Sequence, residues 1–214
     1  MPLKLNSQRV PGKNFKDLLG RPLYRWSLDT VRQLRDEGVF DEVAVYGGPG
    51  IMEHLPPDVA FYTERDVVVA QDGNALFRKM IQRLPNDVAW CCIFNATSPF
   101  TRKTSFEKAM RAVVSGEYDS AASMQVIYGR LWDTYRSATN HDPRTCPRTQ
   151  TQDPIYLESD AFWILQPSLM LEHGRRIGFR PWFQEVTDVE LVDIDTAADW
   201  RLAERIGATL CQKP

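Results

Sequence analysis

A short basic loop near the start of the chain is the first set of residues that could do chemistry. Residues 4–14 read KLNSQRVPGKN and carry Lys4, Arg9 and Lys13. Such a polar run with Pro and Gly does not continue as a regular helix or strand, so its amides should be exposed in a loop. Backbone amides beside cations hold polyphosphates in many proteins, and Gly12 would allow close approach. The loop predicts an anion site, although a solvated basic loop explains these residues equally well.

A pair of carboxylates near the other end of the chain is the second set. Asp193 and Asp195 flank Ile194 within residues 189–195, VELVDID, which we expect to form a strand. Alternation along a strand would point both carboxylates to one face. At the carboxyl edge of a parallel sheet, such a pair could hold Mg2+ on a nucleoside triphosphate. The alternative is that Asp195 caps the following helix and Asp193 is solvated.

The order of apolar segments predicts the fold that must position these groups. Residues 41–47, 58–63 and 88–94 are short, apolar and rich in β-branched or aromatic residues, as buried strands are. Amphipathic helical patterns lie before the first and the third of these segments. We therefore predict an α/β protein with a Rossmann-like, mostly parallel sheet flanked by helices.

Two capping-box patterns predict where further helices begin. Thr104 and Glu107 form one pattern, and Thr196 and Asp199 form the other. Each pattern precedes a stretch with the apolar spacing of a helix, so we expect helices to start at both places.

The chain is expected to be one domain, residues 1–214, with an inserted arm over about 128–188. The strand and helix pattern loosens after residue 127, where Pro, Asn, Asp and Arg accumulate. A new extended run follows at residues 155–165 within the arm.

Composition limits the partners and the location. The chain has 26 Lys and Arg against 28 Asp and Glu, a formal net charge of −2, which argues against a general nucleic-acid or membrane binder. No apolar run approaches the roughly 20 residues that span a bilayer, and no signal-peptide pattern opens the chain. The cysteines lack metal-ligand spacing and suit packing in a reducing cytoplasm; they are Cys91, Cys92, Cys146 and Cys211. We expect a cytoplasmic protein.

The two ends and several motifs between them resemble the CMP-acylneuraminate synthetase (acylneuraminate cytidylyltransferase) family of nucleotidyltransferases. Order and spacing agree with the family over nearly the whole chain. The matching motifs are KLNS at 4–7, PGKN at 11–14, GRPL at 20–23, TSP at 97–99, DS at 119–120 and DIDT at 193–196, followed by Asp199.

The resemblance implies a fold, a reaction and partners. The fold would be of the nucleotide-diphospho-sugar transferase type, with a small inserted dimerisation arm. In the family, an acceptor hydroxyl attacks the α-phosphorus of CTP and expels pyrophosphate. The resemblance thus predicts CTP, Mg2+, an acidic sugar-like acceptor and a homodimer.

The resemblance also carries roles to particular residues. Lys13 and Arg9 would hold the triphosphate and stabilise the leaving group. Asp193 and Asp195 would bind Mg2+, which would activate the incoming hydroxyl. These four residues form the predicted catalytic set. The predicted nucleotide contacts are Lys4, Asn6, Ser7, Arg9, Lys13, Asn14, Arg65 and Asn74.

The acceptor side departs from the family pattern. Asn95 stands where sialic-acid enzymes carry Gln, and Ser159 and Asp160 replace a family Asn-Gly pair. A shorter amide and a new carboxylate would change the reach and charge of the pocket, so we expect a nonulosonic acid or a related acceptor other than N-acetylneuraminate. The predicted substrate contacts are Asn95, Thr97, Arg148, Gln150, Tyr156, Glu158 and Ser159.

Other functions stay compatible with these residues. They are a catalytically silent nucleotide-binding subunit, a metal-dependent glycosyltransferase, and CTP-dependent activation of a phosphate or phosphonate acceptor. Of the strand that precedes the phosphate loop in the family, only Met1, Pro2 and Leu3 are present. We therefore also expect that the natural start lies upstream.

Overall fold

The computed structural model describes residues 1–7, 9–63, 72–145 and 147–211, and it confirms the α/β class. The strands are β1 (Pro2–Leu3), β2 (Asp17–Leu18), β3 (Arg21–Pro22), β4 (Ala44–Gly47), β5 (Ala60–Thr63), β6 (Cys91–Phe94), β7 (Ser120–Ile127), β8 (Ile155–Leu165) and β9 (Pro181–Glu185). The α-helices are α1 (Leu23–Asp36), α2 (Gly73–Ile81), α3 (Lys103–Val114), α4 (Pro167–His173) and α5 (Ala197–Cys211), and short 3-10 turns are η1 (Lys13–Phe15), η2 (Met52–His54), η3 (Thr149–Thr151) and η4 (Asp188–Leu191).

The strands pair in a mixed rather than a mostly parallel arrangement. One sheet has the order β1-β4-β5 and is parallel throughout. The other has the order β6-β8-β7-β9, in which β9 is parallel to β7 while β8 is antiparallel to both of its neighbours. The chain leaves β7 through the arm and returns directly beside it as β8, and such a return gives an antiparallel pair.

Helices cover both faces of the second sheet, and β8 shows why. Phe162 and Ile164 belong to a core cluster shared with α1 and α3, whereas Trp163 and Leu165 belong to a cluster shared with α2 and α4. Successive side chains of a strand point to opposite faces, so four consecutive apolar residues serve two helical layers. Among the described residues, no helix is long and apolar enough to cross a membrane.

The start of α3 differs from the sequence prediction. The capping box of Thr104 and Glu107 is wrong, because α3 begins at Lys103 and no side chain caps it locally. Instead the buried Glu190 accepts hydrogen bonds from the backbone N–H of Arg102 (3.0 Å) and from the Ser105 hydroxyl (2.6 Å). A distant carboxylate therefore satisfies the helix start, and local sequence could not show it.

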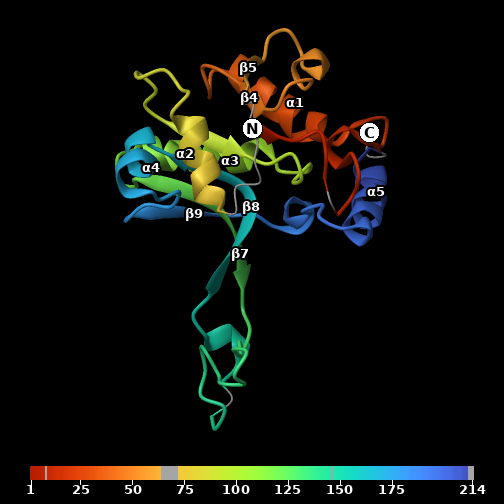
Figure 1. The fold of residues 1–214 in the computed structure, drawn as a ribbon. Helices are drawn as coiled ribbons and strands as arrows, with labels where there is room; N and C mark the ends of the chain where they lie inside the picture. The colour runs from red at the N-terminus through yellow and green to blue at the C-terminus, as the bar shows by residue number, and fades with distance from the viewer. Residues whose placement is uncertain (8, 64–71, 146, 212–214) are drawn as a thin grey trace.

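An arm projects from the body where β7 and β8 leave the sheet (Figure 1). The projecting part covers the paired ends of β7 and β8 and residues 128–154 between them, whereas the rest of β8, α4 and β9, which lie in the predicted 128–188 insertion, pack in the body. The arm exposes Tyr128, Trp132 and Tyr135, the last with 88% of its surface accessible.

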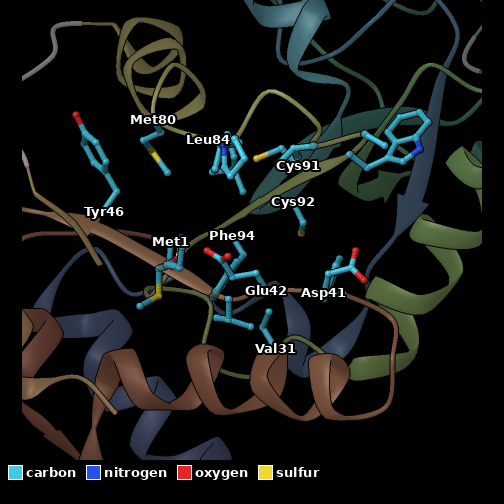
Figure 2. Close-up of a pocket in the computed structure, with 18 of the residues that line it drawn as sticks. Met1, Val31, Asp41, Glu42, Tyr46, Met80, Leu84, Cys91, Cys92 and Phe94 are labelled. Atoms are coloured by element: carbon cyan, nitrogen blue, oxygen red, sulfur yellow. Dashed lines mark hydrogen bonds between the residues drawn. The ribbon is translucent and has the colours of Figure 1, made fainter. Parts of the chain in front are cut away.

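A cavity of about 530 Å3 lies between β4, the central strand of its sheet, and β6, an edge strand of the other sheet. Figure 2 shows Met1, Met80, Cys91 and Phe94 around it. Burial raises the pKa of the Cys91 thiol to about 11 and also raises the pKa of Cys92, so both thiols are protonated at neutral pH. Both are free, as expected of packing cysteines. Cys146 and the side chain of Cys211 lie outside the described structure.

Candidate active site

Lys13 joins the basic loop to the carboxylate pair. Its Nζ donates to the backbone carbonyl of Ile194 at 2.6 Å and to Asp195 Oδ1 at 3.1 Å. Lys13 is only 7% exposed, so its side chain is nearly removed from solvent. Gly12 adopts a left-handed backbone (φ 63°) that turns the loop into η1. In Figure 1 the N-terminal segment accordingly runs beside the start of α5.

Arg9 makes the second contact to the same carboxylate. Its Nη1 lies 2.8 Å from Asp195 Oδ2, and its side chain is 64% exposed. Both Asp195 oxygens are thus paired, one with a buried cation and one with an exposed cation. An exposed ion pair contributes little to stability, so Arg9 can exchange this carboxylate for another anion at small cost.

The segment that carries the two carboxylates is not a strand, so the strand predicted at 189–195 is wrong. Residues Asp188–Leu191 form the turn η4, and an extended, unpaired stretch follows. The predicted alternation nevertheless holds, because the Ile194 side chain is fully buried in a core cluster with Trp200. Its N–H donates to the carbonyl of Thr97 at 2.9 Å. The buried isoleucine and its two backbone bonds fix the flanking carboxylates.

The start of α5 confirms the second capping box. Asp199 Oδ2 accepts from the backbone N–H of Thr196 at 2.7 Å, and the Thr196 hydroxyl accepts from the backbone N–H of Asp199 at 3.3 Å. Asp199 Oδ2 also accepts from the N–H of Asp195 at 3.1 Å. Asp199 and Thr196 therefore cap this helix, and the alternative that Asp195 serves only as its cap is wrong.

Asp193 lies in an unfavourable environment for a charge. Burial raises its pKa, and the nearby carboxylates of Asp195 and Asp160 raise it further, whereas the Thr97 hydroxyl and Lys13 lower it. Its Oδ1 is buried and has no hydrogen-bond partner. A buried, unsatisfied carboxylate oxygen is costly unless something binds it.

The donor set at this position suits a hard cation. Asp193 Oδ1 has no hydrogen-bond partner. Asp195 forms ion pairs with Arg9 and Lys13, and a metal ion could take the place of either cation. Within the described residues, no group of three or more His, Cys, Asp or Glu side chains could hold a metal. Mg2+ typically takes one or two carboxylates and completes its octahedron with phosphate and water, so two carboxylates fit it.

The other predicted nucleotide contacts surround the loop or lie elsewhere. Lys4 is exposed, and its carbonyl accepts from Asn14 Nδ2 at 2.9 Å. Asn6 is exposed, and the Ser7 hydroxyl accepts from the backbone N–H of Val10 at 3.5 Å. These bonds shape the loop and leave Lys4 Nζ at the surface. Arg65 lies outside the described residues.

A bulge in β8 brings several acceptor-side residues together. The pairing of β7 with β8 shifts between Ala122 and Met124, so that residues 159–162 of β8 oppose a single residue of β7. At the bulge, Asp160 has a left-handed backbone (φ 57°), and its carbonyl accepts from Asn95 Nδ2 at 2.8 Å. Bulges re-aim side chains beside functional sites. The structure therefore brings together Asn95, Ser159 and Asp160, as the sequence grouped them.

Asp160 also interacts electrostatically with the carboxylate pair. Partial burial raises its pKa, Glu158 and Asp195 raise it further, and Arg176 lowers it. Asp160 in turn raises the pKa of Asp193. Asn95 bonds to the bulge, and Thr97, two residues later, accepts from the N–H of Ile194, so one short segment contacts both the bulge and the segment of the carboxylate pair.

Arg176 bonds to two of the predicted site residues, and the sequence did not indicate it. Its Nη2 and Nε donate to Glu158 Oε2 at 2.9 and 3.2 Å, and its Nη1 donates to Asn74 Oδ1 at 3.0 Å. One guanidinium thus connects a predicted substrate residue with a predicted nucleotide residue. An Arg-Arg pair after α4 carries no motif, so no local signal could have identified it.

The remaining acceptor candidates belong to the arm or its base. Tyr156 is about half exposed and packs on Phe183 with ring centroids 5.0 Å apart. Arg148 and Gln150 lie in or next to η3 and are exposed. Because the arm projects away from the body (Figure 1), the structure does not bring these two residues to the carboxylates of the same chain.

In sequence, this chain is similar to proteins described as cytidylyltransferases. A family model described as cytidylyltransferase matches residues 1–47. N-acylneuraminate cytidylyltransferase A of Danio rerio is 27% identical over 209 residues, which cover 93% of this chain and 48% of the fish protein. N-acylneuraminate cytidylyltransferase of Oncorhynchus mykiss is 26% identical over 93% of this chain and 47% of its own length. The chain spans about half the length of these curated relatives.

Solved structures show the same fold. A 4-diphosphocytidyl-2C-methyl-D-erythritol synthase from Anaerococcus prevotii superposes with a TM-score of 0.70 at 10% identity, over 97% of this chain and 94% of that chain. A CMP:2-keto-3-deoxy-manno-octonic acid synthetase complexed with CTP superposes with a TM-score of 0.69 at 14% identity, over 98% and 97% of the two chains.

The two cations on Asp195 should contribute unequally to stability. Lys13→Met should lower the free energy of unfolding by about 1–3 kcal/mol, because it leaves the buried carbonyl of Ile194 without its donor and removes one partner of the part-buried Asp195 carboxylate. Arg9→Gln is the matched control and should cost at most about 1 kcal/mol, because that pair is exposed. Urea unfolding of the ligand-free protein measures both. Equal losses would contradict the assignment of Lys13 as the buried junction.

Asp193 should make stability fall as pH rises. A carboxyl whose folded pKa is raised binds its proton more tightly in the folded state, so the free energy of unfolding decreases from about pH 4 up through the raised folded pKa. Asp193→Asn removes this loss, so the variant should be more stable than the parent at pH 7 and equal to it near pH 3. Urea unfolding from pH 3 to 7 in EDTA tests this, with exposed Asp41→Asn as control. A variant less stable at pH 7 would refute the prediction.

Proposed function

We propose that this chain, which resembles the CMP-acylneuraminate synthetase family in its motifs and is similar to N-acylneuraminate cytidylyltransferases, transfers CMP from CTP to an acidic sugar-like acceptor. The oxygen of an acceptor hydroxyl forms a bond to the α-phosphorus while the bond to the bridging oxygen breaks. Pyrophosphate leaves, and the hydroxyl proton is released.

The contact between the basic loop and the carboxylate pair is the observation that carries this proposal. Lys13 and Asp195 are 182 positions apart in the chain but lie 3.1 Å apart in space. A triphosphate needs cations on its oxygens and oxygen ligands for its magnesium, and the fold supplies both at one point.

Each residue of the site has a separate proposed role in this reaction. Lys13 fixes the position of Asp195 and presents positive charge to the phosphates, and the exposed Arg9 can turn from Asp195 to the leaving pyrophosphate. Asp193 and Asp195 would hold Mg2+, which when bound would lower the pKa of the acceptor hydroxyl and neutralise phosphate charge. Gly12 allows the loop backbone to approach the phosphates.

The acceptor is the finer part of the proposal. We assign it to the nonulosonic acids or related sugar acids, because the curated relatives are N-acylneuraminate cytidylyltransferases. The β8 bulge, with Asn95 and Asp160, is the proposed acceptor side. The carboxylate of Asp160 sets the charge of this side of the pocket. A reducing cytoplasm suits the free thiols Cys91 and Cys92, and we include that location in the proposal.

The proposal includes a homodimer formed through the arm. Arg148 and Gln150 lie on the projecting arm, so they could contact an acceptor only at the site of a second copy. Exposed aromatic residues such as Tyr128, Trp132 and Tyr135 are typical of interface anchors.

CTP with Mg2+ should raise the melting midpoint more than UTP, ATP or GTP. At 100 times its dissociation constant, a ligand stabilises the fold by about 2.7 kcal/mol, which corresponds to a few degrees for a chain of this size. Asp195→Asn should abolish the magnesium-dependent part of the shift, because it removes a proposed metal ligand.

The melting midpoints with these nucleotides also distinguish the proposed function from the alternative functions. Pyrophosphate release with a panel of sugar acids then identifies the acceptor, with a phosphate and a phosphonate acceptor in the same panel. If no nucleotide moves the midpoint of the folded protein, the silent-subunit hypothesis replaces the proposal. A shift by a UDP-sugar but not by CTP would favour a glycosyltransferase.

The arm should control the oligomeric state. The parent protein should sediment at twice the chain mass of 24.6 kDa, and Tyr135→Glu should shift it toward the monomer by placing a charge in the interface. Leu202→Glu, which alters an exposed residue of α5, is the control and should leave the dimer intact. A parent protein that stays monomeric at micromolar concentration would reject this part of the proposal.

A further inference from the structure

We propose that Arg176 is a positioning residue that holds the nucleotide side and the acceptor side of the site in one fixed relation. The inference rests on the proposed function and extends it to a residue outside the family motifs. Arg176 lies between α4 and β9, and its guanidinium reaches the first turn of α2 and the edge of the β8 bulge at once.

On the nucleotide side, Arg176 fixes the start of α2 through Asn74. Asn74 Oδ1 accepts from Arg176 Nη1 at 3.0 Å, while its Nδ2 donates to the carbonyl of Gly174 at 3.1 Å. Asp72 caps the same turn by accepting from the backbone N–H of Asn74 at 2.9 Å. Both ends of the Asn74 amide are therefore occupied, so the side chain acts as a tether for the helix start.

On the acceptor side, Arg176 fixes Glu158. Three donors converge on Glu158 Oε2, namely Nε and Nη2 of Arg176 and Nε1 of Trp163 at 3.1 Å. The guanidinium carbon lies 5.5 Å from the centre of the Trp163 ring, which is almost fully buried. Glu158 is also the last residue of β8 that pairs with β7 before the bulge. The arginine thus holds one end of the bulge against the core.

Charge adds a second link between Arg176 and the bulge. Among the groups that act on Asp160, Glu158 and Asp195 are negative, and Arg176 is positive. Arg176 therefore offsets the repulsion that Glu158 would otherwise exert on Asp160. Loss of the guanidinium should therefore release Glu158 at one end of the bulge and remove a positive charge that acts on Asp160.

The contacts require an arginine. A planar guanidinium presents several donors in fixed directions, so it can serve Glu158 and Asn74 together. A lysine ammonium keeps the charge but is a compact group without that fork. The neighbouring Arg175 provides a matched control, because it bonds to the carbonyls of Ile177 and Gly178 and lies over Phe179, away from both partners of Arg176.

The experiment compares Arg176→Gln, Arg176→Lys and Arg175→Gln in the full chain. Arg176→Gln should weaken the affinity for CTP with Mg2+ by on the order of tenfold, within the usual range for coupling between sites. It should also speed hydrogen exchange both at residues 73–76 and at residues 158–162. Arg176→Lys should show part of both effects, and Arg175→Gln should show neither.

A double-mutant cycle shows whether Arg176 acts through Asn74. In an Asn74→Ala background, Arg176→Gln should cause little further loss of CTP affinity, because the tether is already absent. A lower melting midpoint with unchanged CTP affinity would overturn the positioning role, as would additive losses in the cycle.

The exchange measurement keeps the inference separate from the proposed function. If the parent protein binds no CTP, the proposed function fails and the positioning role fails with it. If CTP binds but Arg176→Gln leaves exchange unchanged at both segments, the inference alone fails.

Discussion

The site depends on the contact between the buried ammonium of Lys13 and the segment that carries Asp195. The ammonium bonds to the carbonyl of Ile194 and to Asp195, and so it closes a loop of nearly the whole chain. A nearly buried cation needs partners, and these two oxygens accept hydrogen bonds from it. The ion pair therefore specifies one arrangement of the two chain ends more than it adds stability.

Ile194 shows how packing positions charged groups without a regular element. Its side chain fills a core cluster, its N–H bonds to Thr97, and its carbonyl accepts from Lys13. Three restraints on one residue leave the adjacent carboxylates little freedom to turn away. The consequence is an unfavourable pair: Asp193 is partly buried beside Asp195, and one of its oxygens has no partner. Unfavourable charge environments of this kind are typical of functional sites.

Strand β8 organises the other half of the site. Residues 162–165 alternate between two core clusters and so lock the strand in the sheet. The bulge at 159–162 then interrupts its pairing with β7, which places Asp160 near the carboxylates. Regular pairing continues beyond Glu158 into the arm. The same strand thus contributes to the core, the site and the arm, with Arg176 at the junction.

The sequence by itself determined the α/β class, the capping box of Thr196 and Asp199, and the two charged sets at the chain ends. These features depend on local periodicity, local hydrogen bonds and residue type, which a sequence contains directly. The strand at 189–195 and the cap at Thr104 were wrong for a related reason. Partners far along the chain, Thr97 for the first and Glu190 for the second, supply the hydrogen bonds there.

Only the tertiary structure decided which residues meet. The contact of Lys13 with Asp195, the bulge beside Asn95 and the bridge of Arg176 all join segments that are distant in sequence. Such contacts depend on how the sheets and helices pack, and local propensity carries no information about them. The projecting position of Arg148 likewise follows from the direction in which β7 and β8 leave the body, which the packed sheet sets.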